Sequence, residues 1–370
     1  MWKIIDNYNW DNIRSKFDWV RDMADVPQNP VYHAEGNVEI HTRMVLEALL
    51  SLPEYQALSE QKQHILAASA LLHDVEKRST TVRQPDGRLT SHGHAKKGEF
   101  TARRLLYQQI PTPFIIRETV AKLVRYHGLP LWALDKPNPQ KAVIQASLEV
   151  DTYMLAILAK ADVMGRICQD ADDLFYRIEL FKSLCEENDC LGKPKQFKSP
   201  VARWHYFNKE EASPDYDVFD DTKFEVVVMS ALPGSGKDTY LQQHLSDWPV
   251  VSPDQIRRAM RIKPTDKSGN GKVIQQAKEE ARVLMRKQQS FVWNATNITK
   301  QMRSQLVDSF RAYGAYVKVI YVEVPYPELV KQNGNREHIV PIDVMQKMVG
   351  KLEVPSPVEA HEVDYCIRED

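Results

Sequence analysis

Residues 231–239 read ALPGSGKDT and directly follow the apolar run Phe224–Met229. An apolar strand, a tight glycine-containing turn and a lysine that opens a helix form the layout in which backbone N–H groups surround nucleotide phosphates. The next stretch, Thr239–Leu245, has a helical pattern, so the context fits on both sides. We therefore expect a phosphate-binding loop with these cofactor-binding residues: Leu232, Pro233, Gly234, Ser235, Gly236, Lys237, Asp238 and Thr239.

Two positions of this loop depart from the usual pattern G-x-x-x-x-G-K-[ST]. Ala231 stands at the first glycine, which is tolerable when the backbone there does not need a positive φ. Asp238 stands where a Ser or Thr hydroxyl normally binds Mg²⁺. A carboxylate is a good ligand for a hard cation, so we expect an altered metal site and leave direct ligation by Asp238 open. Lys237 is a catalytic candidate, because its charge meets the β- and γ-phosphates.

The length of the chain predicts more than one domain. It has 370 residues, and the loop at residue 231 leaves a long N-terminal segment for another fold. We expect an N-terminal domain over 1–191, a linker over 192–222 and a P-loop domain over 223–370. The linker contains Trp204, Tyr206 and Phe207, too many aromatics for a free tether, so we expect it to be packed or extended rather than disordered.

Composition narrows the class of protein. Four cysteines without a C-x-x-C pair favour a reducing compartment over a disulfide framework. We find no basic and apolar leader and no apolar stretch near the ~18 residues that span a bilayer, which predicts a soluble cytoplasmic protein without a membrane partner. The formal net charge is −1, so a nucleic acid would have to be held by local basic patches.

The N-terminal half has helical periodicity and little β-branched alternation, which predicts an all-α bundle. The expected helices are Met44–Leu50, Gln63–Leu72, Thr101–Gln109, Arg117–Tyr126, Ala142–Met164 and Ala171–Cys185. Into this apolar frame the chain places His33, His41, His73, His92, His94 and His127, together with Asp74 and Asp162. One helical histidine is more often structural than a ligand, because a single carbonyl can satisfy its ring. Six of them together favour a metal site.

Imidazole and carboxylate ligands suit Mn²⁺, Fe, Co, Ni or Zn in a catalytic site. His73 and Asp74 are adjacent, and adjacent helical side chains point about 100° apart, so ligands from other helices must close the cage. The candidate metal ligands are His33, His41, His73, Asp74, His127 and Asp162.

Two cations are expected beside the two carboxylates. Lys77 follows Asp74 by three residues and Arg166 follows Asp162 by four, so each pair shares a helix face. A cation beside each metal-binding carboxylate is expected where a phosphate oxygen binds the metal. Lys77 and Arg166 are therefore catalytic candidates, and ordinary surface salt bridges are the alternative.

The motif order in this half resembles the HD superfamily of metal-dependent phosphohydrolases. The matching motifs are HTRMVLEA from His41, HDVEK over 73–77, Gly93-His94, YHG over 126–128 and Asp162. The stretch NPVYHAEGNV over 29–38 also looks like the entry of HD domains in tRNA nucleotidyltransferases. Spacing does not decide which of His33 and His41 binds metal and which contacts substrate. His33, His94 and His127 are substrate-binding candidates, and His94 is also a catalytic candidate.

The C-terminal half alternates strands and helices, which predicts a parallel α/β sheet. Asp254 follows a short second strand and would lie at the carboxyl edge of the sheet, where it is a candidate general base. Arg257 shares its helix face and could bind an acceptor phosphate. The alternative is a helix-capping Asp254 with a solvated Arg257. Arg258 is a further substrate-binding candidate, within the basic set Arg257, Arg258, Arg261, Lys263 and Lys267.

Residues 231–341 resemble polynucleotide kinase domains. They contain PGSGK, then D-x-x-R after the second strand, NATN over 294–297, and N-x-N-R ahead of the helix that starts at Pro341. A helix pair with a basic tip is the shape of a kinase lid. Arg336 matches a nucleotide-binding lid arginine, whereas Gln332 and Gly334 stand where relatives often have arginine. The lid is therefore expected to depend on Arg336, with Lys331 as a second contributor.

An HD domain followed by such a kinase resembles the bacterial HD-Pnk family of bifunctional RNA end-healing enzymes. The resemblance implies a 5′-OH polynucleotide kinase that uses ATP or another NTP with Mg²⁺. It also implies a 2′-phosphatase and 2′,3′-cyclic phosphodiesterase that uses Mn²⁺, Ni²⁺, Co²⁺ or Cu²⁺. The implied partners are RNA ends and, functionally, an RNA ligase, while DNA ends and a homodimer stay open. The alternatives are a nucleotide-metabolising or signalling enzyme with a small-molecule kinase, and a non-catalytic nucleotide sensor.

Overall fold

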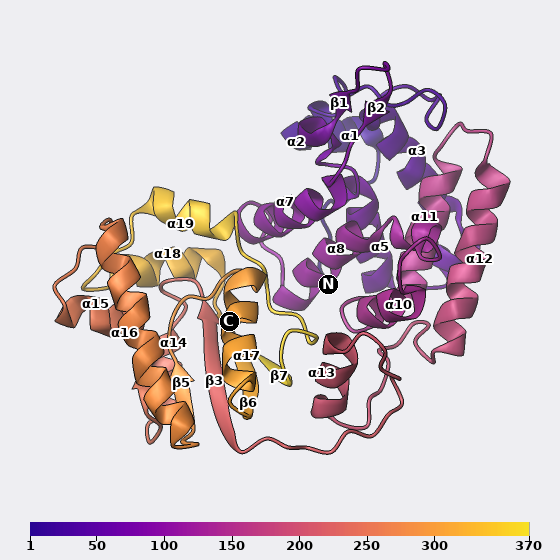
Figure 1. The fold of residues 1–370 in the computed structure, drawn as a ribbon. Helices are drawn as coiled ribbons and strands as arrows, with labels where there is room; N and C mark the ends of the chain where they lie inside the picture. Colours follow the sequence, from indigo (N-terminus) through magenta and orange to yellow (C-terminus); the bar gives the residue numbers. More distant parts are fainter. Residues whose placement is uncertain (370) are drawn as a thin grey trace. The chain divides into compact units, whose positions relative to one another are not determined.

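The computed structural model describes residues 1–369 and divides into two compact units, Met1–Lys195 and a second that begins at Gln196. The first unit is the predicted helical bundle, with one two-stranded hairpin at the Pro85–Gly87 turn (Figure 1). Its elements are α1 (Trp10–Lys16), α2 (Asp18–Arg21), α3 (Val38–Ser51), α4 (Pro53–Gln56), α5 (Glu60–Leu72), α6 (Lys77–Thr80), β1 (Val82–Arg83), β2 (Leu89–Thr90), α7 (His94–Gln108), α8 (Phe114–Tyr126), α9 (Leu129–Trp132), α10 (Pro139–Ser147), α11 (Thr152–Met164) and α12 (Ala171–Glu187).

Helices α3, α5, α8 and α11 form the centre of this unit. In α5 every residue from Ile65 to Leu72 is buried, and α11 is almost as completely buried, because both helices are apolar on all sides. At the end of α11 a Cβ added to Gly165 would collide with Val45 of α3. This close approach brings the end of α11, which carries Asp162, against the helix that carries His41.

The segment 142–164 was predicted to be one helix and instead forms α10 and α11, which meet at 108°. The Asp151 side chain accepts hydrogen bonds from the Tyr153 and Met154 N–H groups and so starts a new helix. An apolar pattern that continues through the corner hides this break. Among the described residues no single helix is long and apolar enough to cross a membrane, and α10 with α11 meets that criterion only as a bent pair.

The second unit contains a five-stranded, fully parallel sheet in the order β4-β5-β3-β6-β7 (Figure 1). Its elements are α13 (Pro200–Asn208), β3 (Phe224–Ala231), α14 (Lys237–His244), β4 (Val250–Val251), α15 (Pro253–Ala259), α16 (Lys267–Arg286), β5 (Phe291–Trp293), α17 (Lys300–Arg311), β6 (Ala315–Glu323), α18 (Tyr326–Gly334), α19 (Ile342–Val349) and β7 (Glu362–Ile367). This is the predicted α/β P-loop fold with a helical pair after β6.

Both faces of the sheet are buried, because the apolar run of β3 alternates between two cores. Val226 and Val228 pack in the core that α16 and α17 cover, while Val227 and Met229 pack in the core that contains Leu241 of α14. The carboxyl ends of β3 and β5 therefore lie side by side next to the start of α14, where ligands of such sheets bind.

The segment 192–222, which was expected to be a linker, belongs mostly to the second unit. Its residues 196–222 group with the second unit and include α13. Arg203 donates to the His361 carbonyl at 2.6 Å, and the Trp204 ring stacks on His361 with centroids 5.1 Å apart. Trp204 thus packs on the residue that precedes β7, while Tyr206 and Phe207 contact the ring of Phe197. The strand β7, which follows His361, was not predicted, because polar and apolar residues alternate over only six positions.

Candidate active sites

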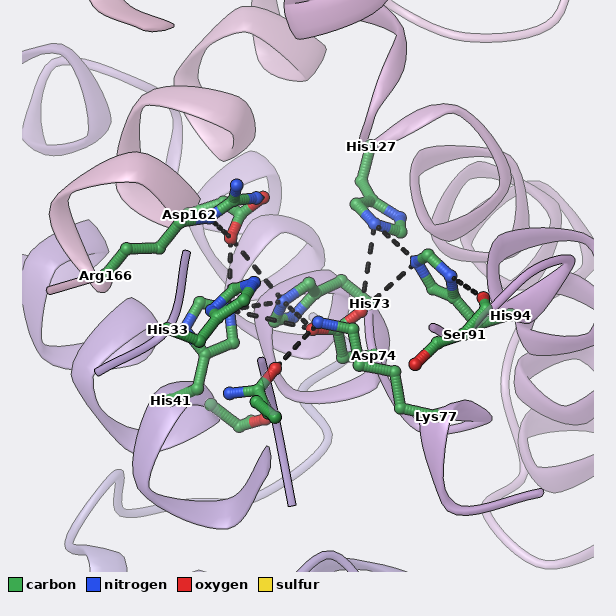
Figure 2. A network of polar contacts seen from close by, with 12 residues as sticks. His33, His41, His73, Asp74, Lys77, Ser91, His94, His127, Asp162 and Arg166 are labelled. Atoms are coloured by element: carbon green, nitrogen blue, oxygen red, sulfur yellow. Dashed lines mark hydrogen bonds and ion pairs between the residues drawn. The ribbon is translucent and has the colours of Figure 1, made fainter. Parts of the chain in front are cut away.

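The first site lies at the centre of the helical unit, where six of the predicted residues meet (Figure 2). They come from different helices: His41 from α3, His73 and Asp74 from the end of α5, His94 from the start of α7, His127 from the end of α8 and Asp162 from α11. His92 is not part of the three groups of metal-capable side chains found among the described residues.

Four of these histidines are held in one tautomer. Each has its Nδ1 atom against a backbone carbonyl: His41 on Gly165 (3.1 Å), His73 on Ala70 (2.7 Å), His94 on Ser91 (2.7 Å) and His127 on Val124 (2.8 Å). Because a carbonyl can only accept, Nδ1 carries the hydrogen, and the Nε2 atom of each neutral ring presents a lone pair. Metal-binding histidines are oriented in this way.

The Nε2 lone pairs of His41 and His73 face each other and Asp162. The two nitrogens are 3.3 Å apart, and Asp162 Oδ1 is 3.1 Å from His41 Nε2. All three residues are buried, and all three facing atoms are acceptors when the rings are neutral. Facing acceptors without a hydrogen between them repel, so the arrangement fits a divalent cation bound among them.

A second group of acceptors lies beside the first. His94 Nε2 and His127 Nε2 are 3.3 Å apart, and Asp74 Oδ1 is 3.3 Å from His94 Nε2. That buried carboxylate oxygen accepts no hydrogen bond. The other oxygen of Asp74, Oδ2, is 3.3 Å from His73 Nε2 in the first group. Asp74 therefore spans both groups, and the donor set fits two divalent cations.

The charges of the site favour ionised carboxylates and a neutral His127 ring, whereas Asp162 and Glu35 outweigh burial and raise the pKa of His41. Burial works to raise the pKa of Asp74, but the nearby Lys77 and His73 outweigh it and hold the pKa well below its ordinary value. Arg166 and His41 do the same for the pKa of buried Asp162. Burial, helped by the neighbouring imidazoles, lowers the pKa of His127 to about 3. Asp74, Asp162 and His127 are therefore ready to bind metal without losing protons near neutral pH.

Lys77 and Arg166 contact the two carboxylates, as their spacing predicts. Lys77 Nζ is 2.7 Å from Asp74 Oδ2, and Arg166 pairs with both oxygens of Asp162. The carboxylates are 2% exposed, whereas the side chains of the two cations are 12% and 14% exposed. The pairs are therefore not surface salt bridges, and each cationic end lies against a buried carboxylate of the cluster.

Glu35 is a residue of this site that the sequence analysis missed. Its buried carboxylate contacts Nδ1 of His33 at 2.8 Å and Nδ1 of His41 at 3.0 Å, and also accepts from the Ile167 N–H group. His33 lies outside the facing group of His41, His73 and Asp162, with its ring edge-on to His41. The position two residues after His33 was the only available signal for Glu35, because its contacts with His41 and Ile167 depend on the fold.

The second site is the loop between β3 and α14. Ala231 is the last residue of β3, and it is not among the described non-glycine residues with positive φ, so the missing glycine is tolerated. Gly234 and Gly236 have φ values of 90° and 85°, which favour glycine. A Cβ at Gly234 would press on Leu329 and Asn333 of α18. The loop is therefore wrapped tightly between the sheet and the lid helix.

Lys237 and Asp238 begin α14 and contact Asn294, the residue after β5. Lys237 Nζ contacts the Asn294 side-chain oxygen and lies 3.1 Å from Asp238 Oδ1. Burial works to raise the pKa of Asp238, but Lys237 and Asn294 outweigh it and lower the pKa. Arg336 also lowers it, which places this exposed lid arginine within electrostatic range of the loop.

Asp254 and Arg257 form an ion pair of 2.7 Å on α15, as their spacing predicts. The helix is capped by Ser252, whose side chain accepts from Gln255 N, so Asp254 is not the capping residue. Arg257 Nε also donates to Asn270 Oδ1 at 3.0 Å. The alternative of a capping Asp254 with a solvated Arg257 is wrong. Arg258 is exposed on the same short helix.

Arg368 is a second residue that the sequence analysis missed. Its guanidinium donates to the Ser235 carbonyl at 2.8 Å, and a Cβ at Gly236 would overlap it. The backbone of Arg368 continues from β7 through a hydrogen bond to the Glu323 carbonyl. No local pattern near the end of the chain signals this contact, because it depends on the position of an unpredicted strand.

Two family models match the chain, each over a different range of residues. Residues 38–174 match the family model of the HD domain, and residues 226–355 match a family model described as an AAA domain. A solved structure from Chloroflexus aurantiacus, described as a kinase, is 14% identical to this chain and has a TM-score of 0.33. The match covers 40% of this chain and 86% of that protein. A gluconokinase from Sinorhizobium meliloti is 16% identical and has a TM-score of 0.28. That match covers 40% of this chain and 83% of the gluconokinase. None of the curated proteins compared with the sequence matches it.

The chain therefore joins an HD domain to a P-loop kinase-like domain. The two matches support an enzyme with phosphohydrolase and phosphotransfer activity, which uses a divalent metal in the first domain and an NTP with Mg²⁺ in the second.

Proposed function

We propose that this protein is a bifunctional RNA end-healing enzyme. The second unit would transfer a phosphoryl group from an NTP to a 5′-OH end, and the first would remove a 2′-phosphate or open a 2′,3′-cyclic phosphate. The observation that carries the proposal is the convergence of four histidine Nε2 lone pairs on Asp74 and Asp162, in a chain that also holds a P-loop.

In the phosphohydrolase, the proposed metal ligands are His41, His73, Asp74, His94, His127 and Asp162. Bound divalent cations would supply Lewis-acid polarisation of the phosphoryl group and activation of water. Lys77 and Arg166 pair with Asp74 and Asp162, and from there their donors would hold phosphate oxygens and neutralise charge that develops on them. His33 has its Nδ1 fixed by Glu35, which leaves Nε2 for the substrate. We therefore assign His41 to metal and His33 to substrate.

In the kinase, Asp254 is the proposed general base. It would accept the proton of the 5′-hydroxyl while Arg257 orients its carboxylate and contacts a phosphate of the acceptor. Because Ser252 already caps α15, the carboxylate of Asp254 is not needed to cap the start of this helix. Lys237, with the N–H groups of the loop and Arg336 of the lid, would bind the NTP phosphates.

A polynucleotide acceptor is favoured by the basic residues around α15. Arg258, Arg261, Lys263 and Lys267 are all exposed and follow Arg257 within ten residues of sequence. A small alcohol would need none of these charges, whereas a nucleic acid backbone is bound by such clusters in a salt-dependent way. Transfer to RNA rather than DNA rests on the resemblance of the whole architecture.

The test compares acceptors and ends in one assay series. With ATP and Mg²⁺, a 5′-OH oligonucleotide should be phosphorylated far better than sugars, polyols or free nucleosides. With a panel of divalent ions, RNA that ends in a 2′,3′-cyclic phosphate should be opened and dephosphorylated. A protein that phosphorylates only small molecules, or hydrolyses only free nucleotides, would instead be a nucleotide-metabolising enzyme.

A further inference from the structure

The P-loop of this chain has an exchange of residue types at two positions that are distant in sequence. P-loop enzymes usually hold the Mg²⁺ of the nucleotide with a Ser or Thr after the loop lysine and an Asp at the end of a nearby strand. Here the first position is Asp238. Strand β5 pairs with the P-loop strand β3 through Val228 and Trp293, and the next residue after β5 is Asn294. The carboxylate thus stands on the helix, and the neutral residue follows the strand.

The two exchanged residues contact each other. Asn294 Nδ2 donates to Asp238 Oδ1 at 3.0 Å, while Asn294 itself is only 5% exposed. Lys237 Nζ contacts the side-chain oxygens of both residues. Compared with the usual P-loop arrangement, the carboxylate is on a different element of the sequence. It nevertheless lies within hydrogen-bond distance of the strand-end residue, where the usual carboxylate would be. The ammonium group beside both oxygens marks a place that attracts cations.

We propose that Asp238 supplies the carboxylate for the Mg²⁺ of the nucleotide, in the role that a strand-end aspartate has in other P-loop enzymes, and that Asn294 positions it. This inference rests on the proposed kinase function. Mg²⁺ in such sites typically takes one or two carboxylates together with phosphate oxygens, and Asp238 retains one. Asn294 leaves the carboxylate without a like-charged neighbour and gives it a donor instead.

The exchange predicts how substitutions combine. Asp238→Thr leaves the site without a carboxylate. Asn294→Asp places two carboxylates within hydrogen-bond distance, with Lys237 as the cation that contacts both positions. The double variant Asp238→Thr/Asn294→Asp restores the usual arrangement, so it should bind the metal better than Asp238→Thr alone. Residues that share one ligand site are expected to show this kind of coupling.

The experiment measures nucleotide affinity with and without Mg²⁺. AMP-PNP, a non-hydrolysable ATP analogue, is titrated into the full chain in MgCl₂ or in EDTA, and the ratio of the two Kd values isolates the contribution of the metal. Because the nucleotide is the probe, cations in the HD domain do not contribute to the ratio. Asp238→Thr should reduce this ratio by about tenfold or more, and the double variant should recover most of the loss. Gln242→Ala, an exposed change on α14, serves as the matched control and should leave the ratio unchanged.

Each of the other possible results would contradict a different part of the proposal. A wild-type ratio in Asp238→Thr would show that Asp238 does not serve the metal, and a double variant no better than Asp238→Thr would show that the two positions do not share it. Asn294→Ala keeps the carboxylate and removes its positioning donor, so it should reduce the ratio less than Asp238→Thr; the reverse order would overturn the assigned roles. No binding of AMP-PNP by the wild type under either condition would refute the kinase function itself.

Discussion

His361 is expected to make the second unit sensitive to acid. It is fully buried, and its ring lies between the rings of Trp204 and Tyr316, with centroids 5.1 and 4.9 Å away. Its Nδ1 atom accepts from the Val317 N–H group at 3.0 Å, so the neutral ring carries its hydrogen on Nε2, which has no hydrogen-bond partner. A proton added to Nδ1 would break the bond to Val317 and bury a charge beside Arg311.

The size and sign of the effect follow from the pKa of this group. Burial first, and then Arg311, lower the pKa of His361 from 6.5 to about 4. At about 1.4 kcal/mol per pH unit this shift is worth about 3 kcal/mol. Because the folded-state pKa is below the unfolded-state value, the unfolded chain binds more protons between these values. Stability is therefore complete above pH 6.5 and falls as the pH drops toward 4.

The assay is native-state hydrogen exchange of the β6 amides in the full chain, corrected for the intrinsic pH dependence, because it reports the opening free energy of this unit alone. Between pH 7 and pH 4.5 the wild type should lose about 2 kcal/mol more than His361→Gln, whose amide oxygen can still accept from Val317. His338→Gln, a change at an exposed histidine of the same unit, should behave like the wild type. Equal pH slopes in the wild type and His361→Gln would refute the reasoning.

The two active sites carry further predictions. Phosphohydrolysis should run on Mn²⁺, Ni²⁺, Co²⁺ or Cu²⁺ and phosphoryl transfer on Mg²⁺, and full phosphohydrolase activity with Mg²⁺ alone would contradict the ligand assignment. Asp254→Asn should lower the kinase rate by about 10²- to 10⁴-fold with ATP affinity nearly unchanged, as measured by steady-state kinetics and nucleotide titration. Arg257→Ala should raise the KM for the oligonucleotide and reduce the salt slope of acceptor binding by about one unit; a higher KM for ATP instead would argue against its role. Arg368→Ala should raise the KM for ATP, because it removes the donor to the Ser235 carbonyl, and an unchanged KM would limit Arg368 to a structural role.

The sequence predicted the P-loop well, because its residues are contiguous and its flanking strand and helix have clear periods. The meeting of His41, His73 and Asp162 was predicted through motif order, since no spacing along one helix could bring them together. The double contact of Asp74 was not predicted, because it depends on which helix end each of its oxygens faces.

Other features were not predicted either, because they also depend on contacts that only the folded chain creates. Glu35 contacts the Nδ1 atoms of two histidines, one of which is on α3, and Arg368 reaches the loop only because β7 completes the sheet. The break between α10 and α11 is set by the Asp151 cap within a continuous apolar pattern, so periodicity alone merges the two helices.

The central claim is that one chain heals both ends of a broken RNA at two separate sites. The most direct measurement gives one RNA, with a 5′-OH and a 2′,3′-cyclic phosphate, to the wild type, Asp74→Asn and Asp254→Asn in the presence of ATP, Mg²⁺ and Mn²⁺. The wild type should convert both ends, Asp74→Asn only the 5′ end, and Asp254→Asn only the 3′ end. Loss of both activities in either folded variant, or unchanged ends with the wild type, would contradict the account.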